Sequence, residues 1–150
     1  MRTSFLRRGF TLIELLLVIG IIAILAAIVI VAINPTKQLG DARNAQRRSD
    51  VNTILNAVYQ YAIDHNGAVP TGIPTGTAKE ICTTDSTDCV GAVAVDLDVL
   101  TGSYLVKVPA DPLVSATGTG THYTIVQNTN GRITVTSTTA EQGATITVTR

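Results

Sequence analysis

The sequence predicts an α+β protein in which a long N-terminal helix packs on a small antiparallel sheet. Three observations predict this fold. An apolar run behind a group of arginines is long enough for a membrane-spanning helix, a second stretch carries apolar residues at helical spacing, and the C-terminal third holds three alternating runs. The chain has 150 residues, 45% of them hydrophobic, which leaves room for one small globular domain.

The charge balance does not favour nucleic acid as a partner. Basic and acidic residues number 11 each, so the net charge gives no reason to expect binding to nucleic acid. Three of the arginines, Arg2, Arg7 and Arg8, precede the apolar run. If that leader were removed, eight basic residues (11 less three) would face 11 acidic ones, and the remaining protein would be mildly acidic.

The uncharged run extends from Leu15 to Ile33. A helix of this length covers roughly 28 Å, enough to cross the core of a bilayer. The arginines before it predict a cytoplasmic N-terminus and an outer C-terminal part. A secretory signal peptide is one alternative, although the run is longer than its apolar region and no A-x-A site closes it. A plain membrane anchor is the other alternative.

Glu14 lies at the start of this apolar stretch. A carboxylate at the centre of a membrane-spanning helix costs about 3 kcal/mol, so it usually marks a partner or a function. Alternatively, Glu14 lies close enough to the end of the helix to reach the lipid headgroups.

The stretch RRGFTLIEL, from Arg7 to Leu15, resembles the processing motif of type IV prepilins and type II secretion pseudopilins. That motif consists of a short basic leader, a glycine, a phenylalanine, and a glutamate as the fifth residue of the mature chain. The resemblance implies that prepilin peptidase cuts between Gly9 and Phe10 and methylates the new amine of Phe10. It also implies a pilin-like fold over most of the chain, with the cysteine loop least covered.

The resemblance divides the chain into four parts. These are a leader peptide (1–9), a transmembrane and filament-core helix (10–33), an amphipathic second half of the helix (34–66) and a globular head (67–150). We expect a single-pass protein of the cytoplasmic membrane with its head outside, and after assembly a filament at the cell surface.

The function implied by the resemblance is that of a structural subunit of a type IV pilus-like filament, and not of an enzyme. Glu14 of one subunit would face the Phe10 amine of its neighbour, because two opposite charges in an apolar bundle reduce each other's desolvation cost. The implied partners are further copies of the chain, prepilin peptidase, an inner-membrane assembly platform with its ATPase, and membrane lipid before assembly. Two alternatives stay open: a piston subunit of a type II secretion pseudopilus, and a membrane-anchored binding module that never polymerises.

The second half of the helix is interrupted at its start. Asn34-Pro35 predicts a kink or local melting, with helix termination as the alternative. Asn66-Gly67 predicts the end of the helix near His65. An apolar stripe that would pack on the head comprises Val51, Ile54, Leu55, Val58 and Ala62.

The segment 37–50 has little apolar content, and we expect it to form a solvated or inter-subunit surface. It contains a mixed charge cluster of Arg43, Arg47 and Arg48 with Asp41 and Asp50. We interpret them as a solvated helix face with pairs at i,i+4. Salt bridges between filament neighbours and a DNA-binding stripe are the alternatives, in that order.

The head contains three predicted strands, 122–128, 132–138 and 144–150, joined as an antiparallel meander. Residues 92–100 predict either a strand or a short helix, and 67–91 read as a long loop. Threonines would face water. The side chains that would cover the helix stripe are Tyr123, Ile125, Ile133, Val135, Ile146 and Val148.

Cys82 and Cys89 are spaced for a short disulfide, which suits an outer, oxidising compartment. Two unrelated thiols are the alternative, and no nearby histidine supports a zinc site. The histidines, His65 and His122, belong to no recognisable catalytic grouping, and we interpret both as surface residues. No cofactor is expected.

Two further stretches, 59–70 and 104–112, resemble the helix exit and the segment before the sheet in major pseudopilins. Pseudopilins of that type bind calcium just after this segment. Here Leu113-Val114 replaces the expected aromatic-glycine pair and SATGTGT contains no acids, so we expect no metal. The less favoured alternative is a calcium site that draws on Asp85, Asp88, Asp96 and Asp98.

Overall fold

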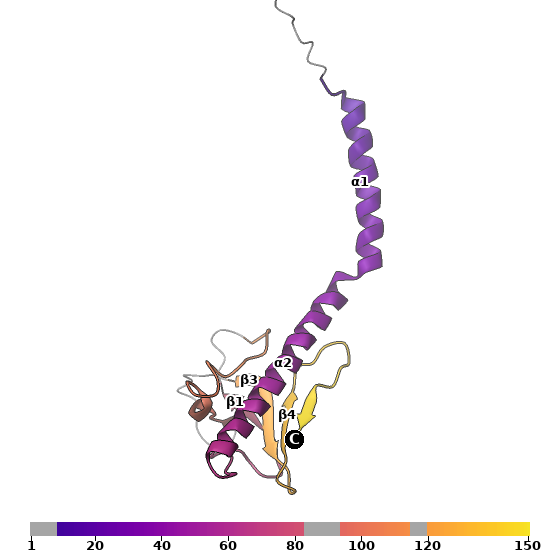
Figure 1. Ribbon diagram of the computed structural model, residues 1–150. Helices are drawn as coiled ribbons and strands as arrows, with labels where there is room; N and C mark the ends of the chain where they lie inside the picture. Colours follow the sequence, from indigo (N-terminus) through magenta and orange to yellow (C-terminus); the bar gives the residue numbers. More distant parts are fainter. Residues whose placement is uncertain (1–8, 83–93, 115–119) are drawn as a thin grey trace, which may run out of the picture. The chain divides into compact units, whose positions relative to one another are not determined.

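The computed structural model describes residues 9–82, 94–114 and 120–150. The chain divides into two compact units, Met1–Gln38 and Leu39–Arg150. The first contains the apolar helix α1, and the second contains most of helix α2 together with the whole sheet (Figure 1).

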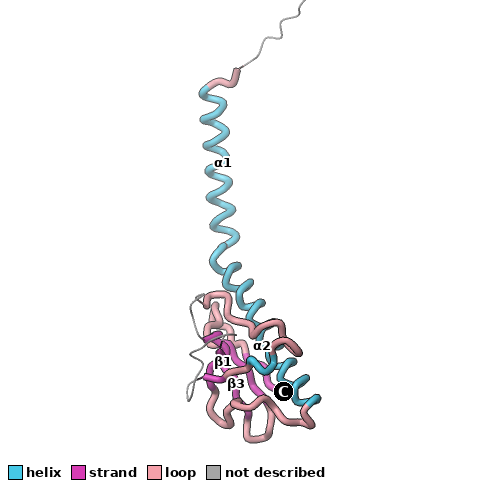
Figure 2. Tube along the Cα trace, turned by 90° about the vertical axis from the view of Figure 1, so that its left-hand side faces the viewer, coloured by secondary structure: helices cyan, strands magenta, loops and turns pink. Residues whose placement is uncertain are grey.

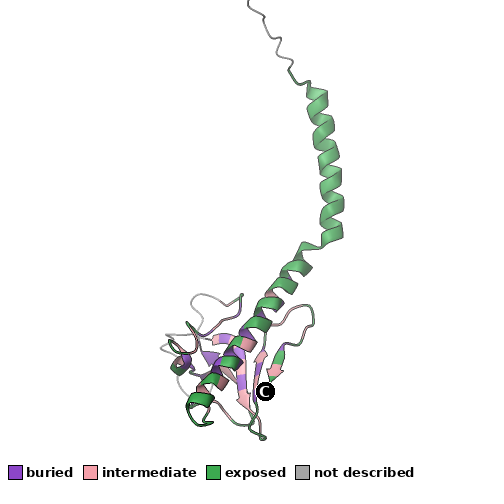
Figure 3. Cartoon of the chain, in the orientation of Figure 1, coloured by how far each residue is buried: buried purple, intermediate pink, exposed green. Residues whose placement is uncertain are grey.

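Helix α1 (Leu12–Ile33) is exposed along its entire length, as the uniform colour of this helix in Figure 3 shows. Within the described chain it is the one helix that is long and apolar enough to cross a membrane. It ends at Asn34, which adopts the left-handed conformation with φ 46°. Helix α2 (Pro35–Asp64) begins at the next residue. Proline suits a first helical position because it has no N–H to satisfy, so the interruption falls where Asn34-Pro35 predicts it.

The sheet of the second unit has the strand order β2-β1-β3-β4-β5. Only β1 and β2 pair in parallel, and the other neighbours are antiparallel. The strands are β1 (Lys79–Cys82), β2 (Ala94–Val95), β3 (Gly120–Gln127), β4 (Ile133–Ser137) and β5 (Thr147–Thr149).

The predicted meander is confirmed as β3, β4 and β5, with Ile125 opposite Val135 and Val135 opposite Val148. The prediction of a long loop over 67–91 is wrong in part, because β1 lies within it and pairs with the sheet's central strand β3. Residues 94–100 contain both predicted alternatives in short form. These are β2 and a 3₁₀ helix, η1 (Asp98–Leu100).

The hydrophobic core lies between α2 and the sheet, which occupy two layers (Figure 2). The stripe residues Val51, Ile54 and Leu55 are fully buried, together with the inner side chains Tyr123 and Ile125. The predicted stripe and the predicted inner face therefore meet. On the opposite face of the sheet, threonine hydroxyls bond across strands, and these pairs are Thr134 with Thr149 at 2.8 Å and Thr136 with Thr147 at 3.1 Å.

Candidate functional site

The predicted cleavage site lies just before α1, which begins at Leu12. Phe10 is 84% exposed, and a side-chain atom added at Gly9 would meet nothing within 4 Å. Both residues on either side of the predicted cleavage bond are therefore open to an approaching peptidase. The leader residues 1–8 lie outside the described part of the chain.

Glu14 and Thr11 form a reciprocal cap at the N-terminus of α1. Glu14 Oε2 accepts hydrogen bonds from the backbone N–H of Thr11 at 2.7 Å and from its hydroxyl at 2.8 Å. The Thr11 hydroxyl in turn accepts the N–H of Glu14 at 3.3 Å. Such a cap satisfies helix donors that would otherwise lack partners, and the negative charge suits the positive end of the helix dipole.

The cap uses only one of the two carboxylate oxygens of Glu14. Among the described residues, Glu14 Oε1 has no hydrogen-bond partner. A carboxylate has about four acceptor positions, so this group can hold its own helix end and still receive an external cation. Sequence reasoning identified Glu14 but missed its bond to Thr11, although the Thr-x-x-Glu spacing from 11 to 14 is a capping-box signature.

Residues 5–30 match the model of the prokaryotic N-terminal methylation motif. This motif supports a type IV pilin- or pseudopilin-like protein. The motif implies a pilin-like subunit that is processed by prepilin peptidase, a kind of protein that is typically structural and not enzymatic. Together with the apolar helix α1 it indicates membrane anchoring before assembly. No curated protein and no solved structure matches the chain.

In the head, Arg47 forms a buried ion network between α2 and two loops. Its side chain is 0% exposed. Its Nε donates to Asp111 Oδ2 at 2.5 Å, and its Nη1 donates to Glu141 Oε2 at 2.7 Å. Arg43 adds a two-pronged contact to Glu141, at 2.7 and 2.6 Å. The network therefore joins α2 to the segment before β3 and to the β4–β5 loop.

Neutral groups complete the network. The amide of Asn44 donates to the Glu141 carbonyl at 2.8 Å and accepts the Glu141 N–H at 3.0 Å. The Thr139 hydroxyl donates to Asp111 at 2.5 Å. Asp50 separately accepts the buried Tyr123 hydroxyl at 2.7 Å. Buried charges are tolerated when they are paired and hydrogen-bonded in this way.

The interpretation of segment 37–50 as a solvated surface is therefore wrong for one of its faces. Gly40, Asn44, Arg47 and Asp50 are buried, whereas Arg48 and Asp41 are exposed. A signal was present in the sequence. Positions 40, 44 and 47 continue the spacing of three and four residues that Val51 and Ile54 begin, so the stripe extends toward the N-terminus with polar members.

The network shifts the pKa values of its acids. Hydrogen bonds from Arg43, and then from Arg47, lower the pKa of Glu141 to about 2. Burial raises the pKa of Asp111, but the bonds from Arg47, Thr139 and the backbone of Leu113 outweigh it, so the net direction is downward. Both acids are thus held as carboxylates, and the pKa of the Arg47 guanidinium is raised, chiefly by Asp111.

The other predicted site residues fall into separate places. Cys82 ends β1, is 3% exposed and is not a free thiol, but Cys89 lies outside the described residues, so their disulfide stays a prediction. His65 stacks on Tyr61 at the end of α2, with ring centroids 3.9 Å apart, and His122 lies in β3.

The calcium alternative gains no site in the described chain. Asp85 and Asp88 lie outside it. Asp96 accepts the N–H of Asp98 at 2.7 Å. No group of three or more potential metal ligands occurs among the residues that the structure describes.

Proposed function

We propose that this chain is a structural subunit of a type IV pilus-like filament. It would be cut after Gly9, methylated at Phe10 and polymerised through α1. The observation that carries the proposal is the match of residues 5–30 to the methylation motif, and this stretch includes most of α1, a helix with no buried residue.

The exposure of α1 on all sides suits both lipid and a bundle of packed helices. A helix that is apolar on all sides is stable in lipid or when packed against other helices. Before assembly, lipid would cover α1. After assembly, the α1 helices of other copies would replace the lipid, and identical subunits related by a repeating head-to-tail operation form an open helical polymer.

Glu14 would set the axial register in which the α1 helices of neighbouring subunits pack. Cleavage after Gly9 would leave a cationic amine on Phe10, four residues before Glu14. In the apolar bundle this amine needs an anion, and the unused Oε1 of a neighbour's Glu14 can supply one without breaking the cap. A subunit that is shifted along the filament axis from this position would leave the Phe10 amine and the Glu14 carboxylate unpaired, at a cost of several kcal/mol.

Two substitutions separate the proposed docking charge from the helix cap. Glu14→Gln keeps the capping interaction, since glutamine also serves at this position, but it removes the charge. Thr11→Ala removes the capping hydroxyl and keeps the charge. We expect Glu14→Gln to insert in the membrane normally and to yield few or no filaments, and Thr11→Ala to assemble. Filaments sheared from cells and counted by electron microscopy give the readout.

The reverse result, in which Glu14→Gln assembles like the wild type and Thr11→Ala does not, would mean that Glu14 serves the cap and not docking. A wild-type protein that stays in the membrane without polymerising would favour the anchored binding module. A pilus and a secretion pseudopilus would share this assembly step, and the length of the filaments released by shearing distinguishes them.

A further inference from the structure

The charge cluster in the first half of α2 divides into members that the head uses and members that it does not. Arg43, Arg47 and Asp50 bond to side chains of the head. Asp41 and Arg48 are exposed, and neither side chain has a hydrogen bond or an ion pair with a residue that the structure describes. One acid and one base of the cluster therefore remain for a contact with another molecule.

Asp41 and Arg48 lie on the same face of α2. Seven residues make just under two turns of a helix, so the two side chains point in nearly the same direction and lie about 10 Å apart along the axis. Ala45 lies between them, is exposed and has only a methyl group, so a second helix can approach closely there. We call Asp41, Ala45 and Arg48 the charge strip. Lys37, one turn before Asp41, forms no ion pair with it.

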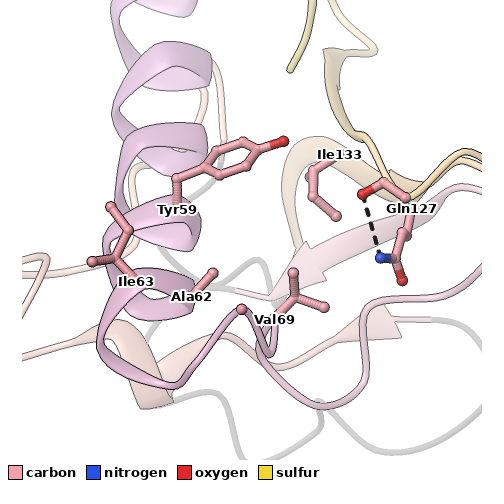
Figure 4. A pocket seen from close by; sticks show the side chains of 8 residues that line it. Tyr59, Ala62, Ile63, Val69, Gln127 and Ile133 are labelled. Carbon is pink, nitrogen blue, oxygen red and sulfur yellow. Dashed lines mark hydrogen bonds between the residues drawn. The ribbon is translucent and has the colours of Figure 1, made fainter.

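The second half of α2 offers no such charges. No residue from 51 to 63 is charged, and Asp64 accepts the Tyr104 hydroxyl at 2.7 Å. Figure 4 shows Tyr59 directed toward Ile133 of β4, where both line a pocket of the head. An ionic contact of α2 with a second molecule is therefore confined to its first half.

We propose that the charge strip of one subunit packs against the charge strip of a second copy that is shifted by about 10 Å along the helix axis, so that Arg48 of one subunit pairs with Asp41 of the next. This contact rests on the proposed function, because subunits of one filament have the same polarity and their α2 helices run in the same direction. A second copy matches the strip because the strip itself supplies one charge of each sign.

The charges favour a shifted arrangement over an unshifted one. Two parallel copies at the same axial position would place Asp41 against Asp41 and Arg48 against Arg48, and like charges repel each other. A shift of two helical turns brings unlike charges together instead. Each subunit then offers Arg48 to one neighbour and Asp41 to another. Such a heterologous contact does not close on itself and propagates as an open polymer.

The predicted shift is directly measurable. Helical reconstruction from electron micrographs of wild-type filaments gives the axial displacement between α2 helices that contact each other. We expect one such pair of helices to be displaced by about 10 Å, with Arg48 of one opposite Asp41 of the other. Filaments in which the charge strip faces solvent would overturn the contact.

Charge reversal tests the same contact in the full chain. Asp41→Arg and Arg48→Asp each place like charges opposite each other, and each should lower the yield of sheared filaments about threefold or more. The double variant again sets an acid opposite a base and should recover most of the wild-type yield. Lys107→Glu, an equal change of charge at an exposed position outside α2, is the matched control and should assemble like the wild type.

The outcomes separate the contact from the fold and from the proposed function. All four variants should melt close to the wild-type temperature, because surface substitutions outside such networks change stability little. Single variants with the wild-type yield would overturn the contact. A double variant that fails like the single ones would also overturn it, because Asp41 and Arg48 would then meet other partners, such as Lys37 or lipid headgroups. If the wild type and the Lys107→Glu control both fail to polymerise, the proposed function falls and the contact falls with it.

Discussion

Arg47 determines how the N-terminal half of α2 is attached to the head. Its guanidinium is fully buried and neutralised by Asp111 and by Glu141, which Arg43 shares. Their sequence separations from Arg47, 64 and 94 residues, explain why sequence reasoning missed the network. A local pattern can show that a polar residue lies on the buried stripe, but it cannot show which distant acid meets it.

Replacement of Arg47 should therefore destabilise the head strongly. Arg47→Ala leaves Asp111 buried without its cation, and removal of one partner of a buried pair costs about 3–5 kcal/mol. The exposed Arg48→Ala is the matched control, with an expected change within about 0.5 kcal/mol. Urea unfolding followed by circular dichroism measures both. Equal stabilities of the two variants would show that the ion network contributes no stability to the fold.

The network also predicts the response of the head to acid. The pKa of Glu141 is lowered to about 2, against about 4.3 for an unperturbed glutamate. Its stabilising contribution is therefore complete above about pH 4.3 and is lost as the pH falls toward 2. We expect the difference in melting temperature between the wild type and Glu141→Gln to be constant from pH 7 to 5 and to narrow below pH 4. A difference that does not change down to pH 2 would contradict this.

At the scale of elements, periodic segments were predictable and short ones were not. The stripe of α2 and the strands β3 and β4 follow from repeats of apolar residues over several turns or positions. Strand β1 has four residues, two of them charged, and lies in a segment rich in Gly, Pro and Thr. It becomes a strand because it pairs with an edge of β3. A contact with a distant strand cannot be predicted from the local sequence.

The joint between α1 and α2 depends on Asn34. Its carbonyl side-chain oxygen accepts the Thr36 hydroxyl at 2.8 Å and the Lys37 N–H at 3.3 Å, while its backbone is left-handed. Asn34→Ala removes this acceptor and strains the backbone, and Pro35 prevents a switch to regular helix. We expect roughly tenfold faster hydrogen exchange at Lys37 and Gln38 in detergent micelles. Asn34→Asp keeps the acceptor and should exchange like the wild type; fast exchange in both variants would contradict the role of the side chain.

At the scale of the whole molecule, the two units of the chain differ in whether they bury their own apolar residues. The head buries its own core, whereas α1 exposes apolar residues on every side. The exposed apolar helix was predictable from the sequence, because a long apolar run is a local feature. The sequence predicts contacts between copies only at Phe10 and Glu14, and these contacts stay a prediction.

The central claim is that the chain enters a filament through a trimmed and methylated N-terminus. Mass spectrometry of the N-terminal peptide, from protein isolated together with its own prepilin peptidase, tests this most directly. We predict a peptide that begins at Phe10 and carries one additional methyl group on its amine. A peptide that begins at Met1 and retains the leader would contradict the account.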